Sequence, residues 1–286
     1  MKKISLVECP RDAMQGMHDF IPTKDKINYL NALLKCNFDV LDFGSFVSPK
    51  AIPQMRDTQE VLEGLDLHGI NTKILAIIAN VKGAQIALQN SQIDILGFPL
   101  SISETFQQRN TNASIAEAWK MLHEISELCH QKNKELLVYL SMGFGNPYGD
   151  AWNEAIVSEF SEKLFTQFGV KTIALSDTIG CATPTLVSSL FSSVIKELPA
   201  LTFGAHLHVL PEHSNSIIEA AYDSGCRRFD GAIKGFGGCP MAKDDLTGNM
   251  PTEKLLEWFL NNNIETNVNR IAFENAYGLS STIFNK

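Results

Sequence analysis

The sequence lacks a long apolar run and contains no closely spaced pair of cysteines. No stretch of it approaches the roughly 18 consecutive apolar residues of a membrane-spanning helix. The opening "MKKISLVECPRD" is too short in apolar residues for a signal peptide, because Glu8 and Pro10 interrupt it. The cysteines form no CxxC motif and are scattered at Cys9, Cys36, Cys129, Cys181, Cys226 and Cys239. We therefore expect reduced thiols, no membrane partner and a cytoplasmic location.

The sequence also lacks an excess of positive charge. It carries 24 lysines and arginines against 32 aspartates and glutamates, which gives a net charge of −8. Proteins that bind nucleic acid usually present a basic face, so we expect no nucleic-acid partner. One or two local cations could still hold a small anionic ligand.

Eight short apolar runs, rich in β-branched residues, alternate with segments of helical periodicity. Several runs are almost continuously apolar, which is typical of parallel strands covered on both faces. The expected strands lie at 4–9, 38–46, 72–79, 93–100, 135–142, 171–178, 201–209 and 227–233. Expected helices lie at 23–36, capped by Thr23, at 114–131, opened by a capping box of Ser114 and Glu117, and at 153–168, 183–197, 213–224, 251–262 and 267–279.

Eight β→α units without a linker or a low-complexity segment predict a closed (β/α)₈ barrel, or TIM barrel, with extra C-terminal helices. We expect one catalytic domain over residues 1–286. The alternative is an open, doubly wound sheet. Because no GxGxxG follows the first run, a dinucleotide-binding version of that sheet is disfavoured.

A TIM barrel carries its active site at the carboxyl ends of its strands, and polar side chains gather at those positions here. This concentration at one end of an apolar barrel favours a site over chance placement. The residues are Arg11, Asp12 and Gln15 after the first run, Asp42, Asp177, His206 and His208 at the ends of later runs, and Cys239 and Asn249 after the last.

The stretch "GAHLHV" places His206 and His208 two positions apart, so both rings point to one side of the sheet. Each buried ring must find its own hydrogen-bond partner, or both must bind one ion. Together with Asp12 and Asn249 they form a mixed nitrogen and oxygen set that suits Mg²⁺, Mn²⁺ or Co²⁺.

Two further residues could act in catalysis. Arg11 could stabilise an oxyanion, or it could form an ion pair with Asp42 or Asp177, and both roles can coexist. Cys239 lies in "FGGCP", where a thiol could act as a general acid or base, or could be an inert loop cysteine.

The motifs "VECPRDAMQ", "SFVSPKAIPQM", "LSDTIG", "GAHLH" and "GFGGCPMA…TGN" together resemble those of the 3-hydroxy-3-methylglutaryl-CoA lyases. These lyases belong to a group of metal-dependent TIM-barrel lyases and Claisen-condensing enzymes, and the resemblance runs from about residue 4 to 266. It implies retro-Claisen cleavage of an acyl-CoA substrate to acetyl-CoA and acetoacetate, as in leucine degradation. It also implies a divalent metal, Mg²⁺ or Mn²⁺, and suggests a homodimer.

The resemblance assigns a role to each matching position. The implied metal ligands are Asp12, His206, His208 and Asn249. Arg11 matches the arginine that stabilises the enolate, Cys239 matches a loop cysteine in proton transfer, and His206 and the site carboxylates are candidates for the base. Other implied site residues are Asp42 beside the arginine, Asp177, Gln15 near the metal, and Asn110 and Asn112 near the acyl-CoA.

Three positions depart from the family pattern. In the family, an acidic residue usually follows the second histidine, where this sequence has Val209. The family also has an arginine on the fifth strand, near the position of Leu137, which this sequence lacks, and Asp42 replaces the usual glutamate. A different 3-hydroxyacyl-CoA, or the reverse condensation, therefore stays open. The alternatives are an aldolase or acyl-CoA condensing enzyme of the same group, and a metal-binding pseudoenzyme.

Overall fold

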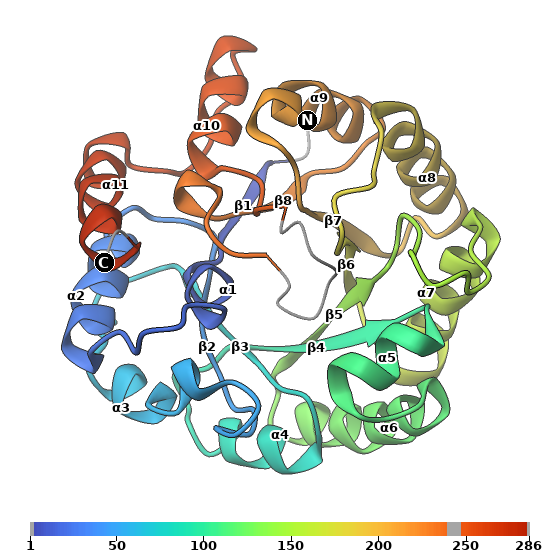
Figure 1. Cartoon of the computed structure of the whole chain (residues 1–286), viewed down its shortest axis with the longest axis horizontal. Coiled ribbons are helices and arrows are strands. Elements are labelled where there is room, and N and C mark those ends of the chain that lie inside the picture. The colour runs from blue at the N-terminus through green and yellow to red at the C-terminus, as the bar shows by residue number, and fades with distance from the viewer. Residues whose placement is uncertain (1–2, 239–246, 285–286) are drawn as a thin grey trace.

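The computed structural model describes residues 3–238 and 247–284, and its strands form a closed parallel barrel (Figure 1). Each strand pairs with the next along the chain, and β8 closes the ring on β1, with Ser5 opposite Arg228. The predicted (β/α)₈ barrel is confirmed. The strands are β1 (Ser5–Glu8), β2 (Val40–Ser45), β3 (Lys73–Ile77), β4 (Ile95–Ser101), β5 (Glu135–Ser141), β6 (Thr172–Asp177), β7 (Thr202–Leu207) and β8 (Arg228–Gly231).

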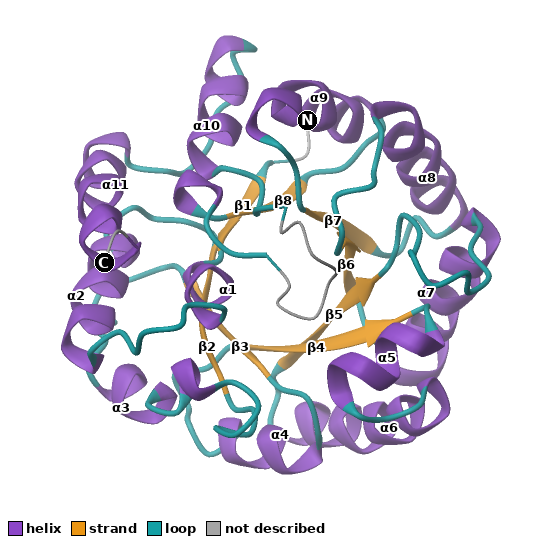
Figure 2. Cartoon of the chain, in the orientation of Figure 1, coloured by secondary structure: helices purple, strands orange, loops and turns teal. Residues whose placement is uncertain are grey.

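Most of the helices form an outer ring around the strands, whereas the short helix α1 (Pro10–Gln15) lies at the mouth of the barrel (Figure 2). None of the described helices combines the length and apolar character that a membrane span requires. They are α1 (Pro10–Gln15), α2 (Thr23–Leu34), α3 (Thr58–Glu63), α4 (Val81–Ala87), α5 (Glu104–Thr111), α6 (Ile115–Gln131), α7 (Glu154–Phe168), α8 (Pro184–Glu197), α9 (Ser214–Asp223), α10 (Thr252–Asn261) and α11 (Arg270–Phe284), with short 3₁₀ turns at Pro53–Met55, Pro211–His213 and Ile233–Gly235.

One predicted helix cap is present and another is not. Ser114 and Glu117 make the expected reciprocal capping box at the start of α6. Thr23, in contrast, is the first residue of α2 and caps nothing. Its hydroxyl donates instead to Asp57 Oδ2 at 2.8 Å, because that buried carboxylate lies within reach.

The core has two layers, and both leave the carboxyl ends of the strands free for polar groups. A large apolar layer lies between strands and helices, and a smaller one fills the barrel interior, with Val7, Leu75 and Leu137 among its members. The C-terminal helix α11 lies beside α2 (Figure 1), where the rings of Tyr29 and Phe284 meet edge to face at 5.9 Å. The outer shell therefore closes between the two ends of the chain.

Candidate active site

A cleft of about 260 Å³ opens at the carboxyl ends of the strands. Six of the predicted site residues line it, namely Arg11, Asp12, Gln15, Asn110, His206 and His208. The rest of the lining mixes hydroxyl and apolar groups, including Ser45, Ser141, Thr178, Ile77 and Tyr139. Five of these six residues are ones that the sequence places at strand ends, whereas Asn110 lies on α5 (Glu104–Thr111).

Asp12, His206 and His208 offer one ligand atom each, and these three atoms lie within 4.8 Å of one another. The strand β7 ends at Leu207, one residue earlier than the second histidine. His208 is held in place by an isolated antiparallel bridge to Asn249, so the segment after β8 folds back onto the end of β7. Three parts of the chain that are distant in sequence thereby meet at one point.

Both imidazoles have a hydrogen-bond partner at Nδ1. His208 Nδ1 lies 3.1 Å from the carbonyl oxygen of Thr178, and His206 Nδ1 lies 3.2 Å from Asp230 Oδ2. Since a carbonyl oxygen only accepts, Nδ1 of His208 carries the proton and Nε2 keeps its lone pair. Burial lowers the pKa of His208 to about 4, so the ring is neutral and able to bind a metal at neutral pH.

Asp12 is the negative centre of the cleft. It accepts hydrogen bonds from Arg11 Nη1 at 2.8 Å, Gln15 Nε2 at 2.6 Å and Asn249 Nδ2 at 2.7 Å. Burial alone would raise the pKa of Asp12, but the positive charge of Arg11, together with the hydrogen bond from Asn249, opposes it and the pKa lies at about 2. The carboxylate is therefore ionised throughout the physiological range.

Arg11 forms an ion pair with Asp42, not with Asp177. Its Nε and Nη2 lie 3.0 and 2.6 Å from Asp42 Oδ2. Asp42 is fully buried on β2, and burial raises its pKa to about 6 against the opposing effect of Arg11. Asp42 itself does not line the described cleft, but it binds Arg11, which does.

Four other predicted residues lie outside the described cleft lining. Asp42 and Asn249 contact it through Arg11 and Asp12, whereas Asp177 and Asn112 have other roles. The Asp177 carboxylate accepts backbone N–H groups of Cys181 and Ala182 at 3.0 and 2.8 Å, so it shapes the loop after β6. Asn112 ends α5 in a left-handed conformation, with φ of 54°. Cys239 lies outside the described residues.

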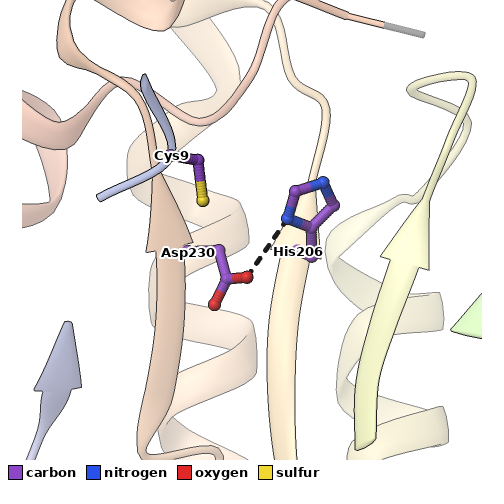
Figure 3. A group of neighbouring side chains, drawn as sticks. All are labelled: Cys9, His206 and Asp230. Carbon is purple, nitrogen blue, oxygen red and sulfur yellow. Dashed lines mark hydrogen bonds and ion pairs between the residues drawn. The ribbon is translucent and has the colours of Figure 1, made fainter. Parts of the chain in front are cut away.

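Sequence reasoning missed a charged pair beneath His206. Arg228 Nη1 lies 2.6 Å from Asp230 Oδ1 on β8, and both residues are buried. His206 stands beside Asp230 and Cys9 (Figure 3). The pattern that could have revealed the pair is the spacing of two within "RRFDGAI", which sends both side chains to one face, as it does for the histidines.

Two of the three departures from the expected pattern, Leu137 and Val209, are apolar and buried. Leu137 belongs to the barrel interior, and it lines the same hollow at the amino ends of the strands as Arg228. Val209 is buried, and its N–H donates to the carbonyl of Gly248 at 2.9 Å. Neither position brings a charge to the described cleft.

The amino-acid sequence of this chain matches a known protein family. The family model described as HMGL-like matches residues 4–277. The mitochondrial hydroxymethylglutaryl-CoA lyase of Rattus norvegicus is 32% identical over 272 residues, which cover 94% of this chain and 82% of the relative.

Solved structures agree with the sequence match. The HMG-CoA lyase of Bacillus subtilis superposes with a TM-score of 0.93 and 31% identity, covering 100% of this chain and 95% of that chain. An HMG-CoA lyase from Acinetobacter baumannii, in complex with coenzyme A and 3-methylmalate, superposes with a TM-score of 0.91 and 31% identity, covering 99% and 92%. The chain therefore belongs to the HMGL-like family of carbon–carbon lyases.

Proposed function

We propose that the protein is a divalent-metal-dependent lyase that cleaves 3-hydroxy-3-methylglutaryl-CoA, or a close 3-hydroxyacyl-CoA, to acetyl-CoA and acetoacetate. One observation carries the proposal: the ligand atoms of Asp12, His206 and His208 converge in the cleft that Arg11 also lines. That arrangement combines a cation site with a fixed guanidinium, the two features that retro-Claisen chemistry needs.

The donor set fits a divalent cation. Asp12 is ionised, His208 is neutral, and both rings use Nδ1 for a protein partner, which leaves Nε2 for an ion. Asn249 uses its amide nitrogen for Asp12 and for the carbonyl of Phe236, so its amide oxygen is available as a fourth ligand. Nitrogen and oxygen donors of this kind favour Mg²⁺ or Mn²⁺, which supply Lewis acidity toward the substrate oxygens.

Arg11 is the group that stabilises the enolate. Its Nε donates to Asp42, its Nη1 to Asp12 and Gln15, and its Nη2 to Asp42. One N–H of Nη2 has no partner among the described residues. A preorganised donor of this kind can stabilise the thioester oxygen as it gains charge.

Cleavage removes the hydroxyl proton of the substrate and later returns a proton to the enolate. The substrate hydroxyl loses its proton to a site carboxylate, because His206 uses Nδ1 for Asp230 and Nε2 for the ion, and the oxygen electrons form the carbonyl of acetoacetate. The carbon–carbon bond breaks, and its electron pair passes to the acetyl-CoA enolate beside Arg11. Cys239 or a water then returns a proton to the enolate carbon; Cys239 follows directly after the last described residue of the loop, Gly238.

The acyl-CoA is the proposed partner of the cleft. The relative from Acinetobacter baumannii holds coenzyme A, which supports a CoA thioester here. Asn110 and Phe106 of α5 also line the cleft. Arg11 is the sole lysine or arginine in the described lining, so little positive charge is available for a free carboxylate of the substrate. Other 3-hydroxyacyl-CoA thioesters should therefore be assayed as a panel beside 3-hydroxy-3-methylglutaryl-CoA.

We propose that residues 1–286 act as one catalytic domain, that the protein forms a homodimer, and that it serves leucine degradation in the cytoplasm. The five described cysteines are all free, which agrees with a reducing compartment.

Incubation of the purified protein with 3-hydroxy-3-methylglutaryl-CoA and Mn²⁺ tests the proposal. Acetoacetate should appear, and removal of the metal with EDTA should stop its formation. The reverse assay, with acetyl-CoA and acetoacetate, separates a lyase from a condensing enzyme. If the protein binds Mn²⁺ but cleaves no acyl-CoA in the panel, it is a pseudoenzyme and the proposal is wrong.

A further inference from the structure

We propose that Arg228 and Asp230 are positioning residues, which together fix the tautomer and the ring orientation of the metal ligand His206. The inference deepens the proposed function and rests on it. Neither residue lines the cleft among the described residues, so neither touches the substrate. Their effect would reach the reaction through the imidazole.

The register of the barrel aligns the three residues. His206 pairs with Asp230 between β7 and β8, and Gly204 pairs with Arg228 two positions earlier. Strand alternation therefore points all these positions toward the barrel interior. A continuous contact results: Arg228 Nη1 lies 2.6 Å from Asp230 Oδ1. Asp230 Oδ2 in turn lies 3.2 Å from His206 Nδ1, the contact drawn in Figure 3.

The direction of the hydrogen bond follows from the charges. Asp230 is 3% exposed, and an ionised carboxylate buried to that degree needs a compensating partner. Arg228, which is 4% exposed, supplies it. The carboxylate then accepts from Nδ1–H of His206, so the lone pair is confined to Nε2. Partners of this kind are worth roughly 10- to 100-fold in metal affinity.

A competing reading assigns Asp230 to a second metal site. Cys9, His206 and Asp230 also offer three ligand atoms within 4.8 Å (Figure 3). Two observations oppose it. The guanidinium of Arg228 already occupies Asp230, and its positive charge repels a cation. In addition, His206 Nδ1 lies 3.2 Å from Asp230 Oδ2 and donates to it, so the ring offers no lone pair on that side.

The space for Arg228 depends on a glycine. A Cβ atom at Gly204 would lie 2.7 Å from Arg228 Nη1 and 3.1 Å from its Cδ. Both distances are shorter than ordinary van der Waals contact. Gly204→Ala therefore displaces the guanidinium without removing any polar group, which makes it an independent probe of the same contact.

The test measures Mn²⁺ binding by isothermal titration, together with the visible spectrum of the Co²⁺ form. Arg228→Met/Asp230→Leu removes both charges at once, because replacing a buried ion pair with apolar residues often leaves folding intact. The matched control is Lys26→Met/Asp57→Leu, which removes another buried pair, 2.7 Å apart and away from the described cleft lining. Cys9→Ala controls for the opposite neighbour of His206.

We expect the Mn²⁺ Kd of Arg228→Met/Asp230→Leu to rise roughly 10- to 100-fold, with an altered Co²⁺ spectrum. Both controls should stay within about twofold of the wild type by the same measure. If the double variant does not fold, Gly204→Ala decides, with an expected rise of at least about threefold. A wild-type Kd in the deciding variant overturns the inference, while acetoacetate formation by the unaltered enzyme would leave the proposed function standing.

Discussion

Arg11 of α1 forms an ion pair with Asp42 of β2 through the Nε and Nη2 edge of its guanidinium. The guanidinium lies at the start of α1, directly after β1, and the carboxylate lies on β2, with Nη2 and Oδ2 2.6 Å apart. Because both side chains are buried, the pair holds the arginine in one orientation at the floor of the cleft. The ion pair and the catalytic role proposed for Arg11 are therefore compatible.

Removing the charge of Asp42 should release the arginine. We expect Asp42→Asn to lower kcat by at least about tenfold, because an amide cannot hold the guanidinium as a carboxylate does. Asp42→Glu restores the residue type that the resemblance leads us to expect and should retain more activity than Asp42→Asn. Steady-state kinetics on both variants measure the difference. Equal kcat for the two variants would contradict a positioning role for the charge.

Arg11→Met should abolish turnover while the protein still binds Mn²⁺. We expect kcat to fall by at least about a hundredfold, which is the loss that follows removal of one oxyanion donor. The control is Arg109→Met, since Arg109 lies outside the described cleft lining and stacks on Tyr148 at 4.8 Å. A variant of Arg11 with wild-type kcat would rule out the enolate role.

His206 and Cys239 should differ in what their loss removes. His206→Ala deletes one of three converging ligand groups, so we expect metal affinity and activity to be lost together. Cys239→Ser should lower activity much less, since a hydroxyl or a water can still return a proton. Mn²⁺ titration and acetoacetate assays on both variants give the comparison. An inactive serine variant that holds its metal would instead make the thiol essential.

Much of the barrel could be predicted from local pattern. The apolar run 135–142 corresponds to β5, Glu135–Ser141, because a strand buried on both faces must be apolar throughout. The spacing of His206 and His208 also predicted their shared face, since alternation along a strand is a local property. Even the end of β7 at Leu207 did not alter this, because the bridge to Asn249 keeps the backbone extended.

Other features of the site could not be predicted, because they depend on contacts between residues that are distant in the sequence or on the fold of a loop. Asp177 resembles a site residue in sequence, but the fold of its own loop brings two backbone N–H groups to its carboxylate. Arg228 and Asp230 lie in a short strand whose charges suggest exposure. Only the register against β7 shows that they face inward, beneath His206.

The buried carboxyl group of Glu8 should make the free energy of unfolding depend on pH, independently of catalysis. Its carboxyl group is fully buried and accepts from Ile233 N at 2.9 Å and Thr252 Oγ1 at 2.5 Å. Burial raises its pKa to about 8 despite these two bonds. The native state therefore holds this proton more tightly than the unfolded chain, and the stability contributed by the group is lost as pH rises from about 4.5 through about 8.

Glu8→Gln should remove that loss, because the amide imitates the protonated acid. Its oxygen can accept from Ile233 N–H, and its nitrogen can donate to Thr252 Oγ1. We expect the variant to gain stability relative to the wild type between pH 5 and pH 9, measured by urea denaturation. The exposed Glu162→Gln on α7 is the control. A constant difference between variant and wild type across this range would show that Glu8 titrates normally.

The close contact between Gly204 and Arg228 limits which substitutions the barrel interior can accept during evolution. An arginine at 228 fits only where 204 carries no side chain, since a methyl group there would meet the guanidinium. Replacement at either position alone is penalised, so glycine and arginine should be gained and lost as a couple among homologous sequences. We expect homologues with a larger residue at position 204 to lack the arginine at position 228. In those homologues a different residue should orient the histidine at position 206.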